Sequence, residues 1–271
     1  MPDARLQDIK LHYDVYGDGD PILMIMGLGA SSAVWDPALV QALASSYGVI
    51  TFDNRGTGQS DKPDAPYSIQ MFADDAAGLL DNLNIPQAHI FGVSMGGMIA
   101  QEFALRHPQR VATLTLGCTT AGGANSVPPP PESLKVLTAP REGVPPDEVI
   151  RRAQPLSYTA GFIASHRDEL EAAIARVLTH PTPPFAFQRQ LEATYTLQTW
   201  DRLPQIKAPT LVVTGSDDVL IPAKNSELIA SRIPGAKLHI IPGVGHGFMH
   251  EGEAAFLKAY LPFLKEHPIE E

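Results

Sequence analysis

The residues of this chain best suited to chemistry form the sequence Gly-Val-Ser-Met-Gly at positions 92–96. A serine hydroxyl is a weak nucleophile unless it is held beside a base and faces the carbonyl that it attacks. A strand-to-helix turn sharp enough to present Ser94 in this way needs very small neighbours, which the two flanking glycines provide. An apolar strand is predicted at 88–93 and a helix at 95–106, so the motif lies in the context that predicts a nucleophilic serine.

A serine nucleophile also needs a histidine base and an acid that orients this base. Asp217 and Asp218 follow an apolar strand predicted at 210–213, and His246 follows another predicted strand at 238–241. Loops at the carboxyl ends of strands are where open α/β sheets place their sites. The chain order serine, aspartate, histidine is that of hydrolases with a nucleophile elbow.

Among the nine histidines of the chain, His246 is the strongest candidate for the base. Glycines on both sides let its loop approach Ser94 closely. His250 is the alternative, but it reads as the start of the next helix. The other seven are interpreted as structural: His12 and His239 lie in strand patterns, and His89, His107, His166, His180 and His267 are expected at surface or boundary positions.

These motifs resemble those of the α/β-hydrolase superfamily, and the resemblance covers nearly the whole chain. It is carried by Asp-Asn-Arg-Gly-Thr-Gly-Gln-Ser at 53–60, Gly-Val-Ser-Met-Gly-Gly-Met at 92–98, Gly-Ser-Asp-Asp at 215–218 and Gly-His at 245–246. Within the superfamily, the chain is most similar to the small esterases and lactonases, a branch that includes the 3-oxoadipate enol-lactonases and the aclacinomycin-type methylesterases.

The resemblance also implies the remaining site residues. The acid of such hydrolases stands third after the glycine that ends its strand, which selects Asp218 and leaves Asp217 as a turn residue in water. The oxyanion is expected to accept hydrogen bonds from the backbone N–H of Met95 and, by correspondence with the His-Gly-x-Gly loop of relatives, from that of Leu28. Met26 replaces the histidine of that loop.

Strand and helix patterns alternate through the first 119 residues, which predicts a mostly parallel, doubly wound sheet. The resemblance implies that this sheet is that of the α/β-hydrolase fold. The alternating residues 11–16 read as an edge strand. A helix predicted from Ser68 to about residue 82 has an apolar stripe, with Asp74 and Asp75 on its solvent side. The glycine-rich motif at 53–60 lacks the phosphate-loop and dinucleotide spacings, so it is interpreted as a structural turn.

The alternation stops at 120–203, where prolines separate helical stretches with apolar faces. Such faces need a partner, so this insertion is interpreted as a helical cap over the site. The predicted organisation is a core of residues 1–119 and 204–271 with a cap of residues 120–203. Cap helices are expected at 147–152, 167–178 and 187–196.

Composition limits the partners. A net charge of −10 argues against nucleic acid and anionic membranes. Only one cysteine, Cys118, is present, which excludes an internal disulfide and fits a reducing compartment; as a lone thiol it is expected to serve packing. No signal peptide or span of about 18 apolar residues is evident. The expected location is cytoplasmic, and a homo-oligomer is left open.

The function expected from these observations is hydrolysis of small carboxylic esters or lactones through an acyl-enzyme. No cluster has metal-ligand spacing, and no cofactor or metal is expected. A carbon–carbon bond hydrolase, a cofactor-free perhydrolase and a ligand receptor of low turnover remain alternatives. The cap should cover a pocket for acyl groups of six carbons or fewer, with aromatic candidates Phe162, Phe185, Phe187, Tyr195 and Trp200.

An enol-lactonase must also hold a substrate carboxylate, so an arginine of the cap would face the pocket. Arg151, Arg152 and Arg189 are the candidates, although charged cap residues usually face water. The sequence leaves the physiological substrate open, together with the choice among these arginines.

Overall fold

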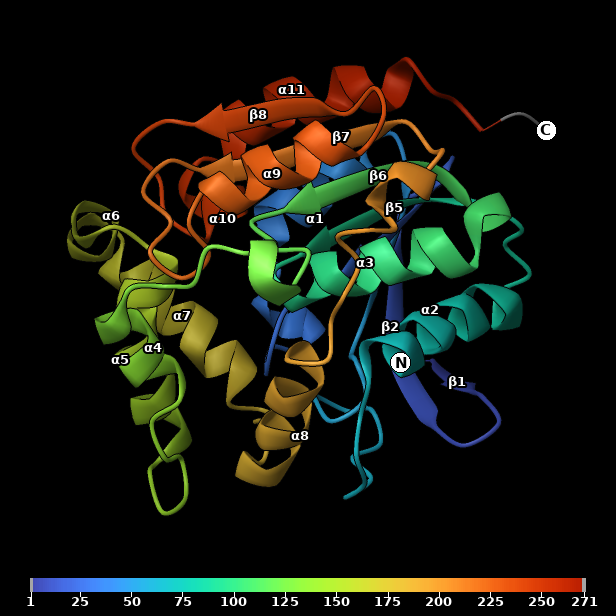
Figure 1. The fold of residues 1–271 in the computed structure, drawn as a ribbon. Helices are drawn as coiled ribbons and strands as arrows, with labels where there is room; N and C mark the ends of the chain where they lie inside the picture. Colours follow the sequence, from blue (N-terminus) through green and yellow to red (C-terminus); the bar gives the residue numbers. More distant parts are fainter. Residues whose placement is uncertain (1, 270–271) are drawn as a thin grey trace.

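The computed structural model describes residues 2–269 and centres on a sheet with the strand order β1-β2-β4-β3-β5-β6-β7-β8 (Figure 1). The pairs β1–β2 and β2–β4 are antiparallel, and all other neighbouring strands are parallel. The strands are β1 (Asp3–Arg5), β2 (Lys10–Tyr16), β3 (Pro21–Ile25), β4 (Gly48–Phe52), β5 (Ala88–Val93), β6 (Val111–Gly117), β7 (Thr210–Gly215) and β8 (Lys237–Ile241).

Helices cover both faces of the sheet, which explains why its central strands are apolar on both sides. On one face, α2 (Ile69–Asn82), α3 (Met95–Arg106) and α9 (Lys224–Arg232) pack against residues such as Leu23 and Ile90. On the other, α1 (Pro37–Ala44), α10 (Phe248–Glu251) and α11 (Glu253–Lys265) pack against their neighbours in the strands, such as Met24 and Phe91. This is the doubly wound arrangement predicted from the sequence.

Five helices lie between β6 and β7 in the chain and gather at one end of the sheet (Figure 1). They are α4 (Pro131–Leu137), α5 (Pro146–Ser157), α6 (Ala160–Ser165), α7 (Arg167–Val177) and α8 (Pro184–Thr194). The three predicted cap helices correspond to α5, α7 and α8, whereas α4 and α6 were not predicted. Prolines occupy the first helical position of α4, α5 and α8, where the missing N–H costs nothing, so they start helices here.

Strand β2 is not the edge strand that its alternating pattern suggested. The short strand β1 pairs with it from outside, with Ala4 opposite Leu11. A three-residue strand is too short to leave a clear period-2 pattern, which is why the sequence did not reveal it. In residues 2–269, no helix is long and apolar enough to cross a lipid bilayer.

Asp75 is buried, contrary to its predicted place on the solvent side of α2. Its two carboxylate oxygens accept hydrogen bonds from Arg55 Nε (2.6 Å) and Nη2 (2.7 Å). A buried guanidinium requires a buried carboxylate partner, and this requirement outweighs the helical pattern. The ion pair fixes the turn at 53–60, which confirms that Arg55 has a structural role there.

His89 is also buried, contrary to its predicted surface or boundary position. It lies in the central strand β5, where its Nδ1 and Thr113 Oγ1 form a hydrogen bond of 2.9 Å. Burial lowers the pKa of His89 to about 4. Its side chain is therefore neutral at ordinary pH, which makes it compatible with the core.

Candidate active site

Ser94 lies in a strained turn between β5 and α3. Its φ of 58° and ψ of −122° are outside the regions that residues with a side chain normally adopt. A Cβ added to Gly92 would lie 2.1 Å from the carbonyl oxygen of Gly96, and one added to Gly96 would lie 2.0 Å from that of Ile25. Only glycine fits at both positions, so these residues allow the turn that presents the Ser94 hydroxyl.

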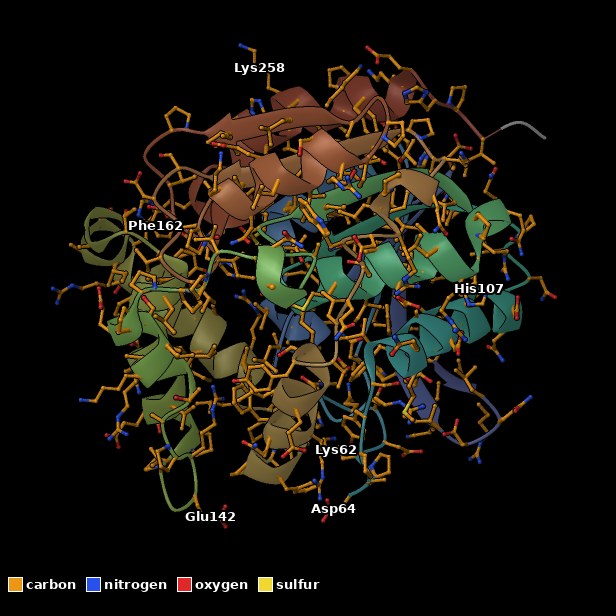
Figure 2. The ribbon with its side chains drawn as sticks, viewed as in Figure 1. Lys62, Asp64, His107, Glu142, Phe162 and Lys258 are labelled. Atoms are coloured by element: carbon orange, nitrogen blue, oxygen red, sulfur yellow. The ribbon has the colours of Figure 1, made fainter. Side chains whose placement is uncertain are left out.

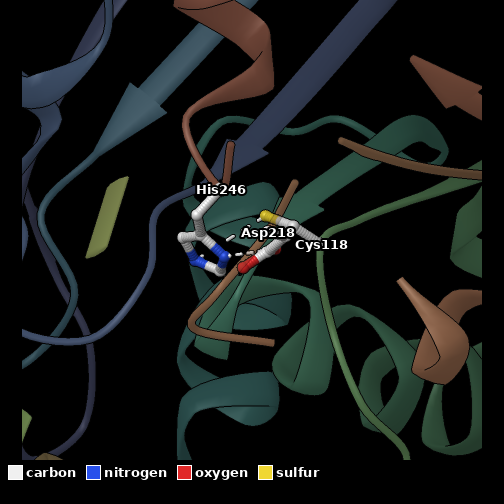
Figure 3. Close-up of side chains that lie close together, drawn as sticks. All are labelled: Cys118, Asp218 and His246. Atoms are coloured by element: carbon white, nitrogen blue, oxygen red, sulfur yellow. Dashed lines mark hydrogen bonds and ion pairs between the residues drawn. The ribbon is translucent and has the colours of Figure 1, made fainter. Parts of the chain in front are cut away.

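His246 and Asp218 are brought together by the loops that follow β8 and β7 (Figure 3). His246 Nδ1 donates a hydrogen bond to Asp218 Oδ2 (2.7 Å), and Asp218 Oδ1 accepts one from each of the N–H groups of Leu220 and Ile221 (2.8 Å each). Both side chains are buried. Because both carboxylate oxygens are occupied, Asp218 is fixed in the orientation that positions the imidazole.

Asp217, the neighbouring carboxylate, is exposed and accepts a hydrogen bond from Ser216 Oγ (2.6 Å). The adjacent residues of this loop therefore point in different directions, one toward His246 and one toward water. This is the geometry that was expected of the pair.

The charge of Asp218 raises the pKa of the His246 imidazole. Burial of His246 disfavours its charged form, but the adjacent carboxylate outweighs this effect and raises the pKa of His246 well above 6.5. The protonated imidazole is the state that forms when a histidine removes the proton of a serine. The pair is thus suited to stabilise that state.

Cys118 lies against the same histidine, a contact that the sequence did not reveal (Figure 3). Its Sγ is 3.8 Å from His246 Nε2, and its φ of +39° makes it a second strained residue beside Ser94. Burial raises the pKa of the Cys118 thiol, so the group remains neutral. Its predicted role was packing, and this contact makes it part of the wall around Nε2.

Ser94 Oγ and His246 form no hydrogen bond within residues 2–269, although both line one cavity. Nucleophile and base are often further apart in structures without substrate than in the complex.

The residues around the imidazole were also compared with a metal site. The Sγ of Cys118, a carboxylate oxygen of Asp218 and a ring nitrogen of His246 all lie within 4.8 Å of one another. The 2.7 Å between His246 Nδ1 and Asp218 Oδ2 is a hydrogen-bond distance, shorter than the separation of about 3.3 Å between two ligands of a tetrahedral zinc ion.

His250, the alternative base, has other partners. Its Nε2 donates to Glu169 Oε1 on α7 (2.7 Å) and is 3.5 Å from Asp36 Oδ2, and its Nδ1 is 3.2 Å from the Tyr158 hydroxyl. These contacts connect α10 to the inserted helices. They favour a linking role for His250 and leave His246 as the histidine that contacts the acid.

The loop after β3 lies beside the Ser94 hydroxyl. A Cβ added to Gly27 would lie 3.4 Å from Ser94 Oγ, so the backbone approaches the nucleophile closely there. The N–H groups of Leu28 and Met95, the expected oxyanion donors, make no hydrogen bond to any described residue. Both residues line the cavity that contains Ser94.

Two side chains missed in the sequence hold this loop in place. Asn54 Nδ2 donates to the carbonyl oxygen of Met26 (3.0 Å). Gln190, which is fully buried on α8, accepts from Gly29 N through Oε1 (2.7 Å) and donates to the Arg55 carbonyl oxygen through Nε2 (2.8 Å). These two side chains thus fix the loop at Met26 and at Gly29.

The cavity has a volume of about 470 Å³ and is walled by the sheet end and the inserted helices. Of the aromatic residues expected there, Phe187 and Tyr195 line it. Phe162, Phe185 and Trp200 are not among its lining residues: Phe162 stacks on Tyr158 and His166, Phe185 is exposed, and Trp200 packs against the core. The apolar lining includes Met26, Trp35, Val93, Met98, Leu134, Leu137, Leu156, Leu191 and Leu197.

The three cap arginines proposed as carboxylate ligands do not line this cavity. Arg151 pairs with Asp147 and Glu171, Arg152 with Glu148, and Arg189 with Asp64 and Glu192. Arg141, which was not considered in the sequence, lines it instead. Its position depends on how the segment between α4 and α5 docks, which no periodicity reveals.

Comparison with known proteins identifies the family of this chain. A family model described as the alpha/beta hydrolase fold matches residues 20–253. The chain belongs to the α/β-hydrolase family. This result confirms the expected fold class and the superfamily resemblance, and it assigns the chain to a family of hydrolases.

Two relatives match most of this α/β hydrolase. "Putative carbamate hydrolase RutD" of Azorhizobium caulinodans is 32% identical over 98% of this chain and 99% of its own length. The poly(3-hydroxyalkanoate) depolymerase of Ectopseudomonas oleovorans is 37% identical over 91% of this chain and 84% of its own length. Among solved structures, the enol-lactonase from Burkholderia xenovorans LB400 has a TM-score of 0.85 and 28% identity, covering 97% of this chain and 100% of that chain.

Proposed function

We propose that this α/β hydrolase cleaves small carboxylic esters or lactones through an acyl-enzyme. Ser94 is the nucleophile, His246 the base and Asp218 the acid that orients the base. The observation that carries the proposal is the buried hydrogen bond from His246 to Asp218 at the wall of the cavity that Ser94 also lines. Similarity to an enol-lactonase structure favours ester and lactone chemistry.

In the proposed reaction, Ser94 Oγ attacks the substrate carbonyl carbon while His246 Nε2 removes the hydroxyl proton. Asp218 stabilises the resulting imidazolium, which then donates its proton to the departing alcohol oxygen. Water, deprotonated by His246, attacks the acyl-enzyme and releases the carboxylic acid and Ser94. The serine–histidine hydrogen bond forms when the substrate is bound.

The oxyanion of the tetrahedral intermediate accepts hydrogen bonds from the N–H groups of Leu28 and Met95. One such donor typically contributes about 2.7–4 kcal/mol of transition-state stabilisation. Both N–H groups lack a partner among the described residues, which supports this assignment. The proposed reaction requires a small-molecule substrate and no metal or cofactor.

Substitution of the nucleophile tests this proposal. Ser94→Ala is expected to lower hydrolysis of p-nitrophenyl butyrate by several orders of magnitude without unfolding the protein, because the acyl-enzyme cannot form. A fluorophosphonate probe should label the wild type and fail to label Ser94→Ala. Persistent labelling of Ser94→Ala would contradict the assignment. A Cys118→Ala variant distinguishes the two nucleophilic atoms near His246, since labelling should survive this change.

Carbamates are a second candidate substrate class. The relative from Azorhizobium caulinodans carries a carbamate hydrolase name and matches nearly the whole chain. A carbamate presents the same kind of carbonyl to Ser94, so the proposed residues would serve it equally. Comparing kcat/KM for an ester and a carbamate with the same alcohol decides between the two classes.

A further inference from the structure

Arg141 connects two walls of the cavity that contains Ser94. It belongs to the segment between α4 and α5, and the next residue, Glu142, lies at the outer tip of this segment (Figure 2). The guanidinium carbon of Arg141 is 3.2 Å from the ring centroid of Phe187, which belongs to α8. Both residues line the cavity. Arg141 therefore spans from one inserted helical segment to the other at the cavity wall.

Arg141 is the only arginine or lysine among the described residues that line this cavity. Its guanidinium makes no ion pair and no hydrogen bond with residues 2–269, although it is half-buried. Burial without an acidic partner lowers the pKa of Arg141 to about 10, so the group remains charged at neutral pH. The three other arginines considered for this role all pair with carboxylates.

An unpaired cation in a partly buried apolar wall is unfavourable unless something compensates it. Phe187 compensates it only in part, since the ring contacts the face of the guanidinium. The N–H groups lie along the edge of this plane, where they match the two oxygens of a carboxylate. The chain has a net charge of −10, yet no acidic side chain within the described part pairs with Arg141.

We propose that Arg141 binds a carboxylate carried by the substrate beyond its scissile carbonyl, so that the enzyme prefers anionic esters or lactones. This inference rests on the proposed function, since it uses the same cavity and the same reaction. Arg141 acts on specificity and takes no part in bond cleavage. The apolar side chains that line the cavity would contact the short chain that joins the scissile carbonyl, at Ser94, to the carboxylate, at Arg141.

Two esters of equal acyl length test the preference: the mono-p-nitrophenyl ester of adipic acid, which is anionic, and p-nitrophenyl hexanoate, which is neutral. Arg141→Gln is expected to lower kcat/KM for the adipate ester by about 10- to 100-fold, mainly through KM, because a charge-assisted hydrogen bond is lost. The hexanoate should change by less than about threefold. Arg141→Lys keeps the positive charge but loses the planar pair of N–H donors that matches a carboxylate. It should therefore keep part of the preference for the adipate ester.

Arg152→Gln is the matched control, because Arg152 is a cap arginine that is exposed, paired with Glu148 and absent from the cavity lining. It should affect neither ester. Equal losses for both esters in Arg141→Gln would indicate that Arg141 only holds the cap together, and unchanged kinetics for the adipate ester would likewise overturn the inference. In both cases the hydrolase proposal would survive, because the wild type would still turn over both esters.

A binding measurement tests the carboxylate site without turnover. In Ser94→Ala, calorimetry with monomethyl adipate and methyl hexanoate should show tighter binding of the anionic ester, and Arg141→Gln in the same background should abolish the difference. If the wild type hydrolyses neither ester but this difference is present, the proposed function fails and the carboxylate site stands. Equal binding of the two esters would overturn the carboxylate site.

Discussion

At the scale of single residues, the candidate site depends on how one carboxylate is held. Asp218 accepts two backbone N–H groups with one oxygen and the His246 imidazole with the other. Its neighbour Asp217 is exposed to water, and among residues 2–269 its side chain forms a hydrogen bond only with Ser216. Two adjacent residues of identical type therefore have different environments, and a conservative substitution of each separates their roles.

Asp218→Asn is expected to lower kcat far more than Asp217→Asn. The amide keeps the size of the side chain but no longer favours the imidazole tautomer with a proton on Nδ1, and the corresponding change in serine proteases costs about 10⁴-fold in kcat. The pH profile gives a second readout. The base must be neutral to act, so wild-type kcat/KM should rise with pH through an inflection above 6.5, because the pKa of His246 is raised.

Removal of the carboxylate charge destabilises the imidazolium, so the inflection in Asp218→Asn should move to lower pH while the maximum rate falls. Asp217→Asn is the matched control and should keep the wild-type inflection. Equal losses in the two variants, or an inflection that moves only in Asp217→Asn, would show that the wrong member of the pair was assigned.

At the scale of elements, the inserted helices shape the site by more than covering it. Helix α8 contributes Gln190, whose amide joins the loop at Gly29 to the carbonyl of Arg55. The expected oxyanion donor Leu28 is the residue before Gly29. The position of a backbone N–H group in the core thus depends on a side chain of the insertion, which couples the two parts of the chain.

Gln190→Met is expected to lower kcat by about tenfold or more with little change in KM. The substitution keeps the volume but leaves the half-buried Gly29 N–H and the buried Arg55 carbonyl without partners, which costs up to about 1–3 kcal/mol each and loosens the loop. Gln188→Met is the control, because Gln188 lies on the same helix and is exposed, and within the described part of the chain its side chain forms a hydrogen bond only with Glu192. Steady-state kinetics and thermal unfolding of both variants measure the two effects.

A loss of stability in Gln190→Met without a loss of kcat would contradict the positioning role and leave a purely structural one. A similar fall of kcat in Gln188→Met would point instead to a general effect of α8. Intact protein is confirmed for both variants by circular dichroism before the kinetics are compared.

The strands of the sheet other than the short β1 could be predicted from the sequence, because each buried strand is a short apolar run bounded by glycine or polar residues. The turn at Ser94 was predictable because its glycines are a local requirement. Gln190 and Arg141 were not, since their roles arise from contacts with residues far away in the chain. Asp75 was wrongly predicted on the solvent side of α2 for the same reason, because its partner Arg55 lies outside this helix.

At the scale of the whole molecule, the cavity is formed by the core and the insertion together. Ser94, Met95 and His246 come from the ends of the sheet, and Leu156 and Phe187 come from α5 and α8. The division into a core of 1–119 and 204–271 and a cap of 120–203 remains our proposal for the domain organisation. Under this proposal, the size of the substrate is set by the gap between the two parts.

The preferred neutral esters should therefore be short, with acyl groups of about two to six carbons. A cavity of about 470 Å³ with walls on several sides has a limited length, and each group beyond its volume forces overpacking that typically costs about 1–3 kcal/mol. A series of p-nitrophenyl esters from acetate to palmitate, measured as kcat/KM, should peak in this range and collapse by about twelve carbons.

The opposite outcome has a clear physical meaning. A maximum at long chains, or activation at an oil–water interface, would require the inserted helices to move away from the core and expose an open groove. The depolymerase relative acts, by its name, on a polymer, so an open groove is the specific alternative to this walled cavity. Because Gln190 joins α8 to the loop at Gly29, opening would break its hydrogen bonds to the core. If the enzyme opens in this way, Gln190→Met should shift the chain-length optimum toward longer esters. If the inserted helices stay on the core during turnover, the variant should keep the short-chain optimum and lose only rate.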